Sequence, residues 1–313
     1  MRNRAGAIAG RIAQIVPTFF LIGLVVFVLA RLLPGDAVSA MLGDRATDET
    51  VRRLSHQLGL DQSILSQLVT FLAQAAQGRF GNSLAFRVPV ASLIAERLPV
   101  TLLLAGMATM IALCLALPLA FVAAMTANRW PDILIRAVFQ VGLSSPVFYV
   151  GLVLLTLFAA GLRLFPVGGY GEGFGEHLYH LFLPALTLAL SFSAVIMRTL
   201  RGSILAVLRA EFVDFARAKG LSARVVLLRH VLRSAAITTV TLVGLHIGSL
   251  LGGAVITESV FAVPGVGRLM VDSIFARDYP VIQALTLILA VLVSLTFLAT
   301  DLLHGWLDPR TGV

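Results

Sequence analysis

The sequence predicts an all-α membrane protein with six transmembrane helices, and three observations lead to that prediction. Hydrophobic residues make up 58% of the 313 residues and charged residues only 13%, whereas a soluble domain carries about 25% charged residues. Apolar runs of about 20 residues, long enough to cross a hydrocarbon core of about 30 Å, recur along the chain. The basic residues lie mostly between these runs. Together these features exclude an ordinary water-soluble fold.

Each expected membrane span is an apolar run with a polar or basic boundary. The six runs cover residues 12–33, 99–125, 133–160, 181–199, 235–257 and 281–303. The first run follows Arg2, Arg4 and Arg11 and could be taken for a cleaved signal peptide. Its apolar core is longer than the usual ~7 to 15 residues of such peptides, so we interpret it as a retained first helix.

The net charge of +8 is explained by topology. Nucleic-acid binding would need Lys and Arg gathered on one solvated face with aromatic partners, and they are not so arranged. Basic residues concentrate in the N-terminus, in the turn 128–136 and in the segment 198–233, whereas the segments 34–98, 161–180 and 259–280 balance their charges. The positive-inside rule therefore predicts that the basic segments and both termini are cytoplasmic.

Several kinds of chemistry have no matching motif in the sequence. Cys114 is the only cysteine and lies in an apolar run, so neither an internal disulfide nor a cysteine metal cluster is expected. The sequence lacks a GxxxxGK[ST] phosphate loop, an HExxH zinc pattern and a G-x-S-x-G nucleophile elbow. We therefore expect no catalytic residue, no directly bound cofactor and no metal, and any ATP-derived energy must come from a partner.

The runs divide the chain into four expected parts. These are an N-terminal tail with the first helix (1–33), an extracytoplasmic helical segment (34–98), a five-helix core that includes a long loop at 200–235 (99–305), and a cytoplasmic tail (306–313). In the second part, Thr47 is expected to cap one helix and Asp61 another, with Gly59 and Gly78 as stops. This segment is expected to pack on the membrane domain, and a docking surface for an extracytoplasmic partner is the alternative.

The loop 200–235 contains two short amphipathic patterns that meet at Gly220. The apolar positions before Gly220 recur at helical spacing and are Leu205, Leu208, Phe212 and Phe215. Beyond it, Ser222 is a candidate N-cap, and the apolar positions are Val225, Leu228 and Leu232. Gly220 suits the corner because glycine takes a positive φ without a Cβ clash. A basic amphipathic pair can also lie on anionic lipid, so that role stays open.

The stretch EFVDFARAKGLSARVVLLRHVLRSAA at 211–236 resembles the EAA signature loop in permease subunits of ABC importers for dipeptides, oligopeptides, nickel and glutathione. The matching residues are Glu211, Ala216, Ala218 and Gly220. ARAKGLS stands between the fourth and fifth runs, where the family has it. The resemblance implies that this loop forms coupling helices in a groove of the ATPase subunit. The residues expected to couple are Glu211, Phe212, Phe215, Ala216, Ala218, Gly220 and Leu221.

The resemblance covers essentially the whole chain. Further matching motifs are LPGD at 33–36, LGLD at 58–61, ERLPVTLLLA at 96–105, ESVFAVPGVGRLMVDSIFARDYPVIQA at 258–284 and WLDPR at 306–310. They are similar to the family's longer subunit type, with its extended outer segment. Positions that depart from the family pattern are Ser63, Arg79, Asp214, Phe215, Ile237 and Thr238. They leave the cargo open among dipeptides, oligopeptides, glutathione and nickel.

Family membership would imply a type I ABC importer permease fold in a bacterial inner membrane, working by alternating access. The implied partners are a second homologous permease, forming a heterodimer, two cytoplasmic subunits that bind ATP and Mg, and an extracytoplasmic substrate-binding protein. A proton-coupled secondary transporter is the alternative function. Such carriers usually need carboxylates near the bilayer midplane, and Glu258 and Asp301 lie near span ends.

Polar and small residues inside the expected spans have two interpretations each. Gly244, Gly248 and Gly252 repeat every fourth residue, a pattern typical of close helix packing, although such a face could border the substrate path. His246 lies near the middle of the fifth span, where a neutral, hydrogen-bonded histidine competes with a proton relay or metal ligand.

Pro146 is expected to kink the third span. It follows Ser144 and Ser145, whose hydroxyls can bond the carbonyls that a proline leaves unpaired. The kink could widen the pathway, but a fixed structural bend is a sufficient explanation.

Overall fold

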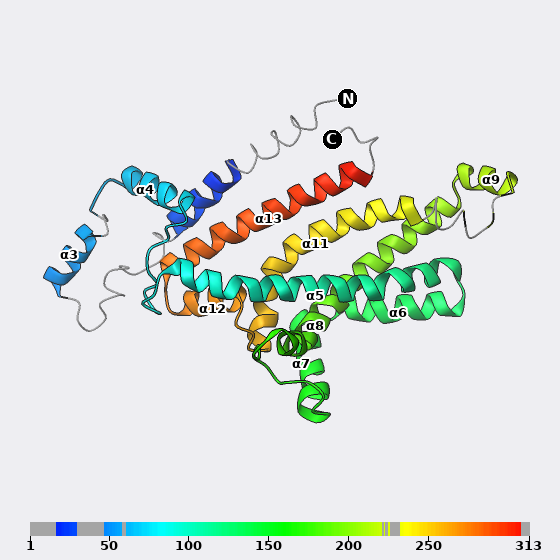
Figure 1. The fold of residues 1–313 in the computed structure, drawn as a ribbon, viewed down its shortest axis with the longest axis horizontal. Helices are drawn as coiled ribbons and strands as arrows, with labels where there is room; N and C mark the ends of the chain where they lie inside the picture. The colour runs from blue at the N-terminus through cyan, green and yellow to red at the C-terminus, as the bar shows by residue number, and fades with distance from the viewer. Residues whose placement is uncertain are drawn as a thin grey trace.

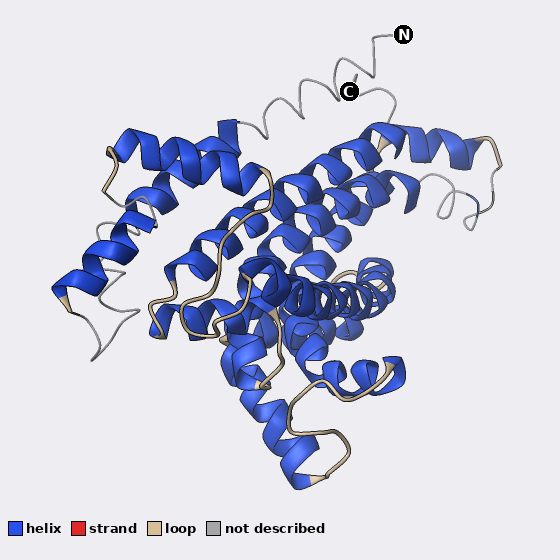
Figure 2. Cartoon of the chain, turned by 60° about the vertical axis from the view of Figure 1, so that its left-hand side comes forward, coloured by secondary structure: helices blue, strands red, loops and turns tan. Residues whose placement is uncertain are grey.

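The computed structural model describes residues 17–29, 47–57, 61–220, 222, 225 and 232–307, and these residues form helices and loops without a β-strand (Figure 2). The predicted all-α class is confirmed. In chain order the helices are Pro17–Leu29, α3 (Asp48–Gln57), α4 (Ile64–Ala76), α5 (Val90–Met125), α6 (Trp130–Ser144), α7 (Val147–Leu154), the π-helix η2 (Leu155–Gly161), α8 (Phe174–Leu208), α9 (Glu211–Ala218), α11 (Leu232–Val260), α12 (Val266–Phe275) and α13 (Tyr279–Leu307).

Apolar helices occupy all six predicted spans, although they differ in length. Within the described residues, α5, α8 and the Tyr279–Leu303 part of α13 are long and apolar enough to cross a membrane. The bent pair formed by α6 with α7 and η2 makes a fourth crossing if it counts as one span. Shorter apolar stretches at Pro17–Leu29 and at Thr239–Gly248 of α11 lie in the first and fifth predicted spans.

Helix α5 begins well before the predicted start of the second span at 99. Its 36 residues correspond to about 54 Å of helix, more than the ~30 Å hydrocarbon core. The hydropathy pattern ends at Glu96 and Arg97, but charged residues are compatible with a helix that continues beyond the apolar zone. Apolar length therefore predicted the membrane-spanning part of α5 and not the whole helix.

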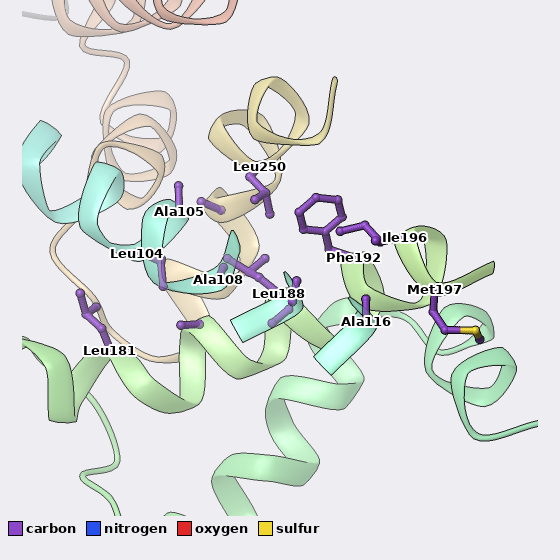
Figure 3. Close-up of a cluster of buried hydrophobic side chains, with 14 of the residues drawn as sticks. Leu104, Ala105, Ala108, Ala116, Leu181, Leu188, Phe192, Ile196, Met197 and Leu250 are labelled. Atoms are coloured by element: carbon purple, nitrogen blue, oxygen red, sulfur yellow. The ribbon is translucent and has the colours of Figure 1, made fainter. Parts of the chain in front are cut away.

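The core of the bundle is the contact between α5 and α8, with α11 packed against both. Figure 3 shows side chains from these three helices meeting, among them Ala108 of α5, Phe192 of α8 and Leu250 of α11. On α5 most buried side chains at this contact are small: Ala108, Ala112, Ala116 and Ala120 have no exposed surface, and Leu104 is the larger side chain buried as completely. Small residues every fourth position let two helices approach closely.

The two ends of the bundle carry different structures, with α9 at one end and α3 and α4 at the other (Figure 1). Helix α3 starts after Thr47, as predicted, since the Val51 amide donates to the Thr47 carbonyl at 2.9 Å. The predicted cap of α4 is wrong by two residues. Ser63, not Asp61, caps α4, because the Ser66 amide donates to the Ser63 hydroxyl at 3.3 Å.

Candidate coupling site

Helix α9 leaves the end of α8 through a tight turn, and the side chain of Val213 packs it against the core. The Val213 amide donates to the Ala210 carbonyl at 2.9 Å, and the Val213 side chain is fully buried in the main hydrophobic cluster. Phe212 and Phe215 are 48% and 63% exposed. The aromatic rings therefore lie mostly outside the core.

This arrangement corrects the single apolar stripe predicted for residues 205–215. Leu205 and Leu208 pack against the core, but the helix is interrupted after Leu208, and the helical period does not continue in phase across the interruption. Val213, which lies outside the predicted stripe, consequently anchors α9.

Gly220 forms the predicted corner. Its φ is +79°, a left-handed conformation that favours glycine. A Cβ built there would meet no atom within 4 Å, so the constraint is on the backbone and not on space. Just before the corner, Lys219 lies over the Phe215 ring with Nζ 4.6 Å from the centroid.

The remaining predicted coupling residues are placed only in part. Glu211 is exposed in the first turn of α9, where the helix dipole favours a negative charge. Ala216 and Ala218 lie on α9, whereas Leu221 lies outside the described residues. The Val225 amide donates to the Ser222 hydroxyl at 3.4 Å, the contact expected if Ser222 caps a second helix.

A buried ion pair fixes α6 to α8 near this end of the bundle. Arg201 donates from Nε to Asp132 Oδ1 at 2.7 Å and from Nη2 to Oδ2 at 2.6 Å. The Asn128 amide also donates to Oδ2, at 2.8 Å. Asp132 is fully buried, and the Arg201 side chain is 16% exposed. Arg201 lies about two turns before the end of α8, so this pair stiffens the base from which α9 projects.

Sequence reasoning missed this pair. The two residues are 69 positions apart, and nothing in one sequence shows that the start of α6 meets the last turns of α8. The available signal was local: Asp132 follows Pro131 in the first turn of α6, where a carboxylate is favoured.

The third span is broken where a kink was predicted. Pro146 is the N-cap of α7, and the chain turns by 105° between α6 and the α7–η2 segment. Ser145 Oγ donates to Val141 O at 2.9 Å, but that carbonyl also accepts from the Ser145 amide at 3.1 Å, so it is not the Gly142 carbonyl that Pro146 leaves without its helical donor. Proline removes a backbone donor but does not set the size of the bend, so the break exceeds the prediction.

The glycine face of α11 lies against α13 where the structure describes its surroundings. A Cβ on Gly244 would overlap the Thr300 side chain, and one on Gly248 would lie 3.4 Å from Val293 Cγ1. Both positions therefore have the close helix contact of the packing interpretation. Gly252 lies one turn further along α11.

His246 lies at the contact between α11 and α8. Its ring centroid is 4.1 Å from that of Phe192, with the planes tilted by 43°. The imidazole is half-buried. Within the described residues, no group of three or more His, Cys, Asp or Glu side chains could hold a metal ion, and a functional role for His246 stays a prediction.

A second buried carboxylate, Glu258, joins three helices and was also missed as a structural centre. It has no exposed surface and receives bonds from the Thr101 hydroxyl at 2.6 Å and the Arg268 amide at 2.9 Å. The Thr101 oxygen in turn accepts from the Val266 amide at 2.9 Å. The first turn of α12 is thereby capped by side chains from α5 and α11.

The sequence of the chain matches two protein families and is similar to characterised permeases. Residues 116–313 match the family described as binding-protein-dependent transport system inner membrane component, and residues 7–105 match its N-terminal membrane component family. The chain is 38% identical over 299 residues to the glutathione transport system permease protein GsiC of Escherichia coli (strain K12), covering 96% of each chain. GsiC of Shigella flexneri serotype 5b (strain 8401) matches with the same identity and coverage.

Solved structures show the same fold at low sequence identity. An inward-facing MetNI methionine ABC transporter aligns with a TM-score of 0.58 at 16% identity, over 69% of this chain and 96% of that chain. An amino acid ABC transporter crystallised with histidines aligns with a TM-score of 0.53 at 18% identity, over 70% of this chain and 94% of that chain. These two likenesses concern the fold alone.

Proposed function

The chain belongs to the binding-protein-dependent transport system inner membrane components, and on that premise we propose that the α9 corner couples it to ATPase subunits. It is a transmembrane permease subunit of an ATP-binding-cassette importer of the peptide, nickel and glutathione type. The observation that supports the coupling role most strongly is the exposed aromatic face of α9, which lies beside a glycine corner between the fourth and fifth spans.

The position of this face favours a protein partner over lipid. Helix α8 continues from Arg201 to Leu208 before α9 begins, which corresponds to about 10 Å of helix. Phe212 and Phe215 therefore lie at the end of the bundle and not along its sides. Exposed aromatic residues of this kind commonly anchor protein interfaces.

The packing of α9 gives a physical route for coupling. Val213 joins α9 to the main hydrophobic cluster, and the Asp132–Arg201 pair makes the last turns of α8 rigid relative to α6. Because α8 also forms the central contact with α5, a force on α9 reaches both central helices. Motion of the ATPase subunits would thereby switch the pathway between inward-facing and outward-facing states.

The proposed assembly contains a second, homologous permease, two ATPase subunits that bind ATP and Mg²⁺, and an extracytoplasmic substrate-binding protein. This chain supplies no catalytic group for hydrolysis. The basic segments 128–136 and 198–233 support an orientation with α9 and both termini in the cytoplasm. On this orientation, α3 and α4 face the compartment from which cargo arrives.

The proposed cargo is a small peptide, with glutathione as the first candidate because the relatives at 38% identity are glutathione permeases. Uptake of labelled glutathione, dipeptides, oligopeptides and nickel in a strain that lacks this chain would rank the candidates. Mass spectrometry of the ligand carried by the purified binding protein provides an independent measurement. Uptake of nickel alone would exclude the peptide proposal.

The coupling role is tested with Gly220→Val and Glu211→Ala in the complete reconstituted transporter. Valine strains the backbone at the positive φ, by about 1 to 3 kcal/mol locally, and alanine removes the exposed charge at the start of α9. Both variants should insert normally, lose most transport, and lose the stimulation of ATP hydrolysis by loaded binding protein.

A lipid-surface role for the loop gives a different result, because both substitutions keep its basic residues. Near-normal uptake and stimulated hydrolysis in both variants would exclude the coupling role. Uptake that survives loss of the ATPase phosphate-loop lysine and collapses with a protonophore would instead favour a proton-coupled carrier.

Orientation is tested by labelling single cysteines after Cys114, which is exposed, has been replaced. Cysteines at Ser66 and Gly171 should react with an impermeant maleimide in intact cells, and one at Ser222 should react only after lysis. Labelling of the Ser222 variant in intact cells would show that the chain has the opposite orientation in the membrane.

A further inference from the structure

We propose that a pocket between α6 and α8 binds the headgroup of an anionic phospholipid. The pocket has a volume of about 390 Å³, and three arginines line it: Arg136 from α6, and Arg198 and Arg201 from α8. It lies beside the Asp132–Arg201 ion pair at the α9 end of the bundle.

The charges around the pocket do not cancel. Asp132 takes two hydrogen bonds from Arg201 and lies 3.2 Å from Arg136 Nε. Arg198 makes no ion pair within the part of the chain that the structure describes. Three guanidinium groups line the pocket, and the one carboxylate beside it, Asp132, pairs with two of them, which leaves an excess of two positive charges. A phosphodiester, which accepts paired bonds from guanidinium, has the chemistry to bind them.

The polarity of the pocket changes along the helix axes as a lipid requires. Arg198 and Arg201 lie near the end of the fourth predicted span, and Arg136 lies one turn inside the third. Further towards the membrane interior the lining is mostly apolar, with Phe139 and Leu143 of α6 beside the polar side chain of Gln140. From Arg136 to Leu143 is about 10 Å along α6, so a headgroup at the arginines would place an acyl chain along the apolar wall.

The pocket is also accessible to a lipid. The side chain of Arg136 is 47% exposed, and Ile133, which also lines the pocket, is 54% exposed. Basic pockets between transmembrane helices near one membrane surface are typical sites for anionic headgroups. A small soluble anion would use the arginines but gain nothing from the apolar wall.

The test uses the complete purified transporter, delipidated and studied by native mass spectrometry. It is titrated with phosphatidylglycerol and with phosphatidylcholine of the same acyl chains, and separately with glycerol phosphate. Arg198→Gln is the informative variant, because Arg198 is exposed and its loss leaves the Asp132–Arg201 pair intact. Arg129→Gln is the matched control, since Arg129 occupies the N-cap position of α6 without a side-chain capping bond and does not line the pocket.

The wild-type transporter should bind phosphatidylglycerol in preference to phosphatidylcholine. Arg198→Gln should weaken the phosphatidylglycerol adduct about fivefold, the effect of about one arginine charge at a membrane surface, and Arg129→Gln should leave it unchanged. Equal binding by all three proteins, or equal losses in both variants, would exclude this pocket as the site.

Two further arms separate the lipid from other anions. If glycerol phosphate binds as tightly as phosphatidylglycerol, the natural ligand is a soluble phosphate and the lipid proposal is wrong. If glutathione displaces phosphatidylglycerol, the pocket is a cargo site, and this result would overturn the lipid proposal. If no phosphatidylglycerol adduct forms on the complete transporter, the proposal fails.

Discussion

The α12 turn and the α9 corner both connect two long helices, yet they are built in opposite ways. At the α12 turn, Glu258 has no exposed surface and accepts hydrogen bonds from groups outside its own helix. At the α9 corner, Phe215 is 63% exposed, and the described part of the connection depends on Val213 and the conformation of Gly220. One connection is completed within the chain, and the other presents a surface for a partner.

The difference predicts separate roles for the two regions: the α12 turn stabilises the fold, and the α9 corner transmits motion from the ATPase subunits. Buried hydrogen bonds at the α12 turn hold α5, α11 and α12 together, so changes there should lower the free energy of unfolding. Changes at the α9 corner should spare folding and impair transport. The following four predictions test that separation, ordered by their expected effect on stability.

Glu258→Ala should destabilise the protein most. The change leaves the Thr101 hydroxyl and the Arg268 amide without their buried acceptor, at about 1 to 3 kcal/mol for each group. The midpoint of thermal unfolding of the detergent-purified complex should fall clearly. Glu211→Ala removes an exposed glutamate and is the matched control, with an unchanged midpoint. Equal midpoints for both variants would contradict the contrast between the two regions.

Gly265→Ala should cost about 1 to 3 kcal/mol by overpacking. A Cβ at this position would overlap the Glu258 carboxylate, so either the carboxylate or the start of α12 must shift. Gly106→Ala on α5 is the control, since a Cβ there meets nothing within 4 Å. The two thermal midpoints should differ, with the Gly265 variant lower. If they coincide, the α12 turn is looser than its hydrogen bonds indicate.

Gly220→Ala should cost about 1 to 2 kcal/mol locally, the penalty of a left-handed conformation for a residue with a side chain. The strain is confined to the corner, so the thermal midpoint should change little while transport falls. Gly202→Ala is the matched control, because it also has open space around it but lies inside α8, where alanine is favoured. Transport that is equal in the two variants would show that the corner tolerates other backbone conformations.

Phe215→Ser should change stability least. The ring is mostly exposed, and its contact with Lys219 is worth about 0.5 kcal/mol at such a site. ATP hydrolysis stimulated by loaded binding protein should nevertheless fall. Val213→Ser, two residues away in the core, should lower the thermal midpoint instead. A Phe215 variant that unfolds as readily as the Val213 variant would place the ring in the fold and not at an interface.

Local patterns predicted the fold well where a single segment contains the cause. Apolar helices lie in all six predicted spans, and three or four of them are long enough to cross a membrane. The positive φ of Gly220 is also as predicted. The break at Pro146 shows the limit, since the residue removes a hydrogen bond but the neighbouring helices determine the 105° turn. Likewise, Ser63 replaces Asp61 as a cap because the cap is set by where α4 begins.

Long-range pairs could not be predicted from the sequence. Asp132 and Arg201 are 69 positions apart, and Thr101 and Glu258 are 157 positions apart. Each pair depends on which helices become neighbours, which hydropathy does not determine. In the sequence Glu258 is an ionisable residue near a span end, and its structural role depends on α5 and α12 packing around it.

The contact between Gly244 and Thr300 has a consequence for how this permease can diverge. The Thr300 hydroxyl donates to the Thr296 carbonyl at 2.7 Å, which favours the rotamer that occupies the space beside Gly244. A larger residue at 244 is therefore tolerated only after a smaller one appears at 300, and not in the reverse order. Descendants of this sequence should show the two positions changing as a pair, with glycine at 300 preceding alanine at 244, because the Thr300 Cβ itself occupies the space beside Gly244.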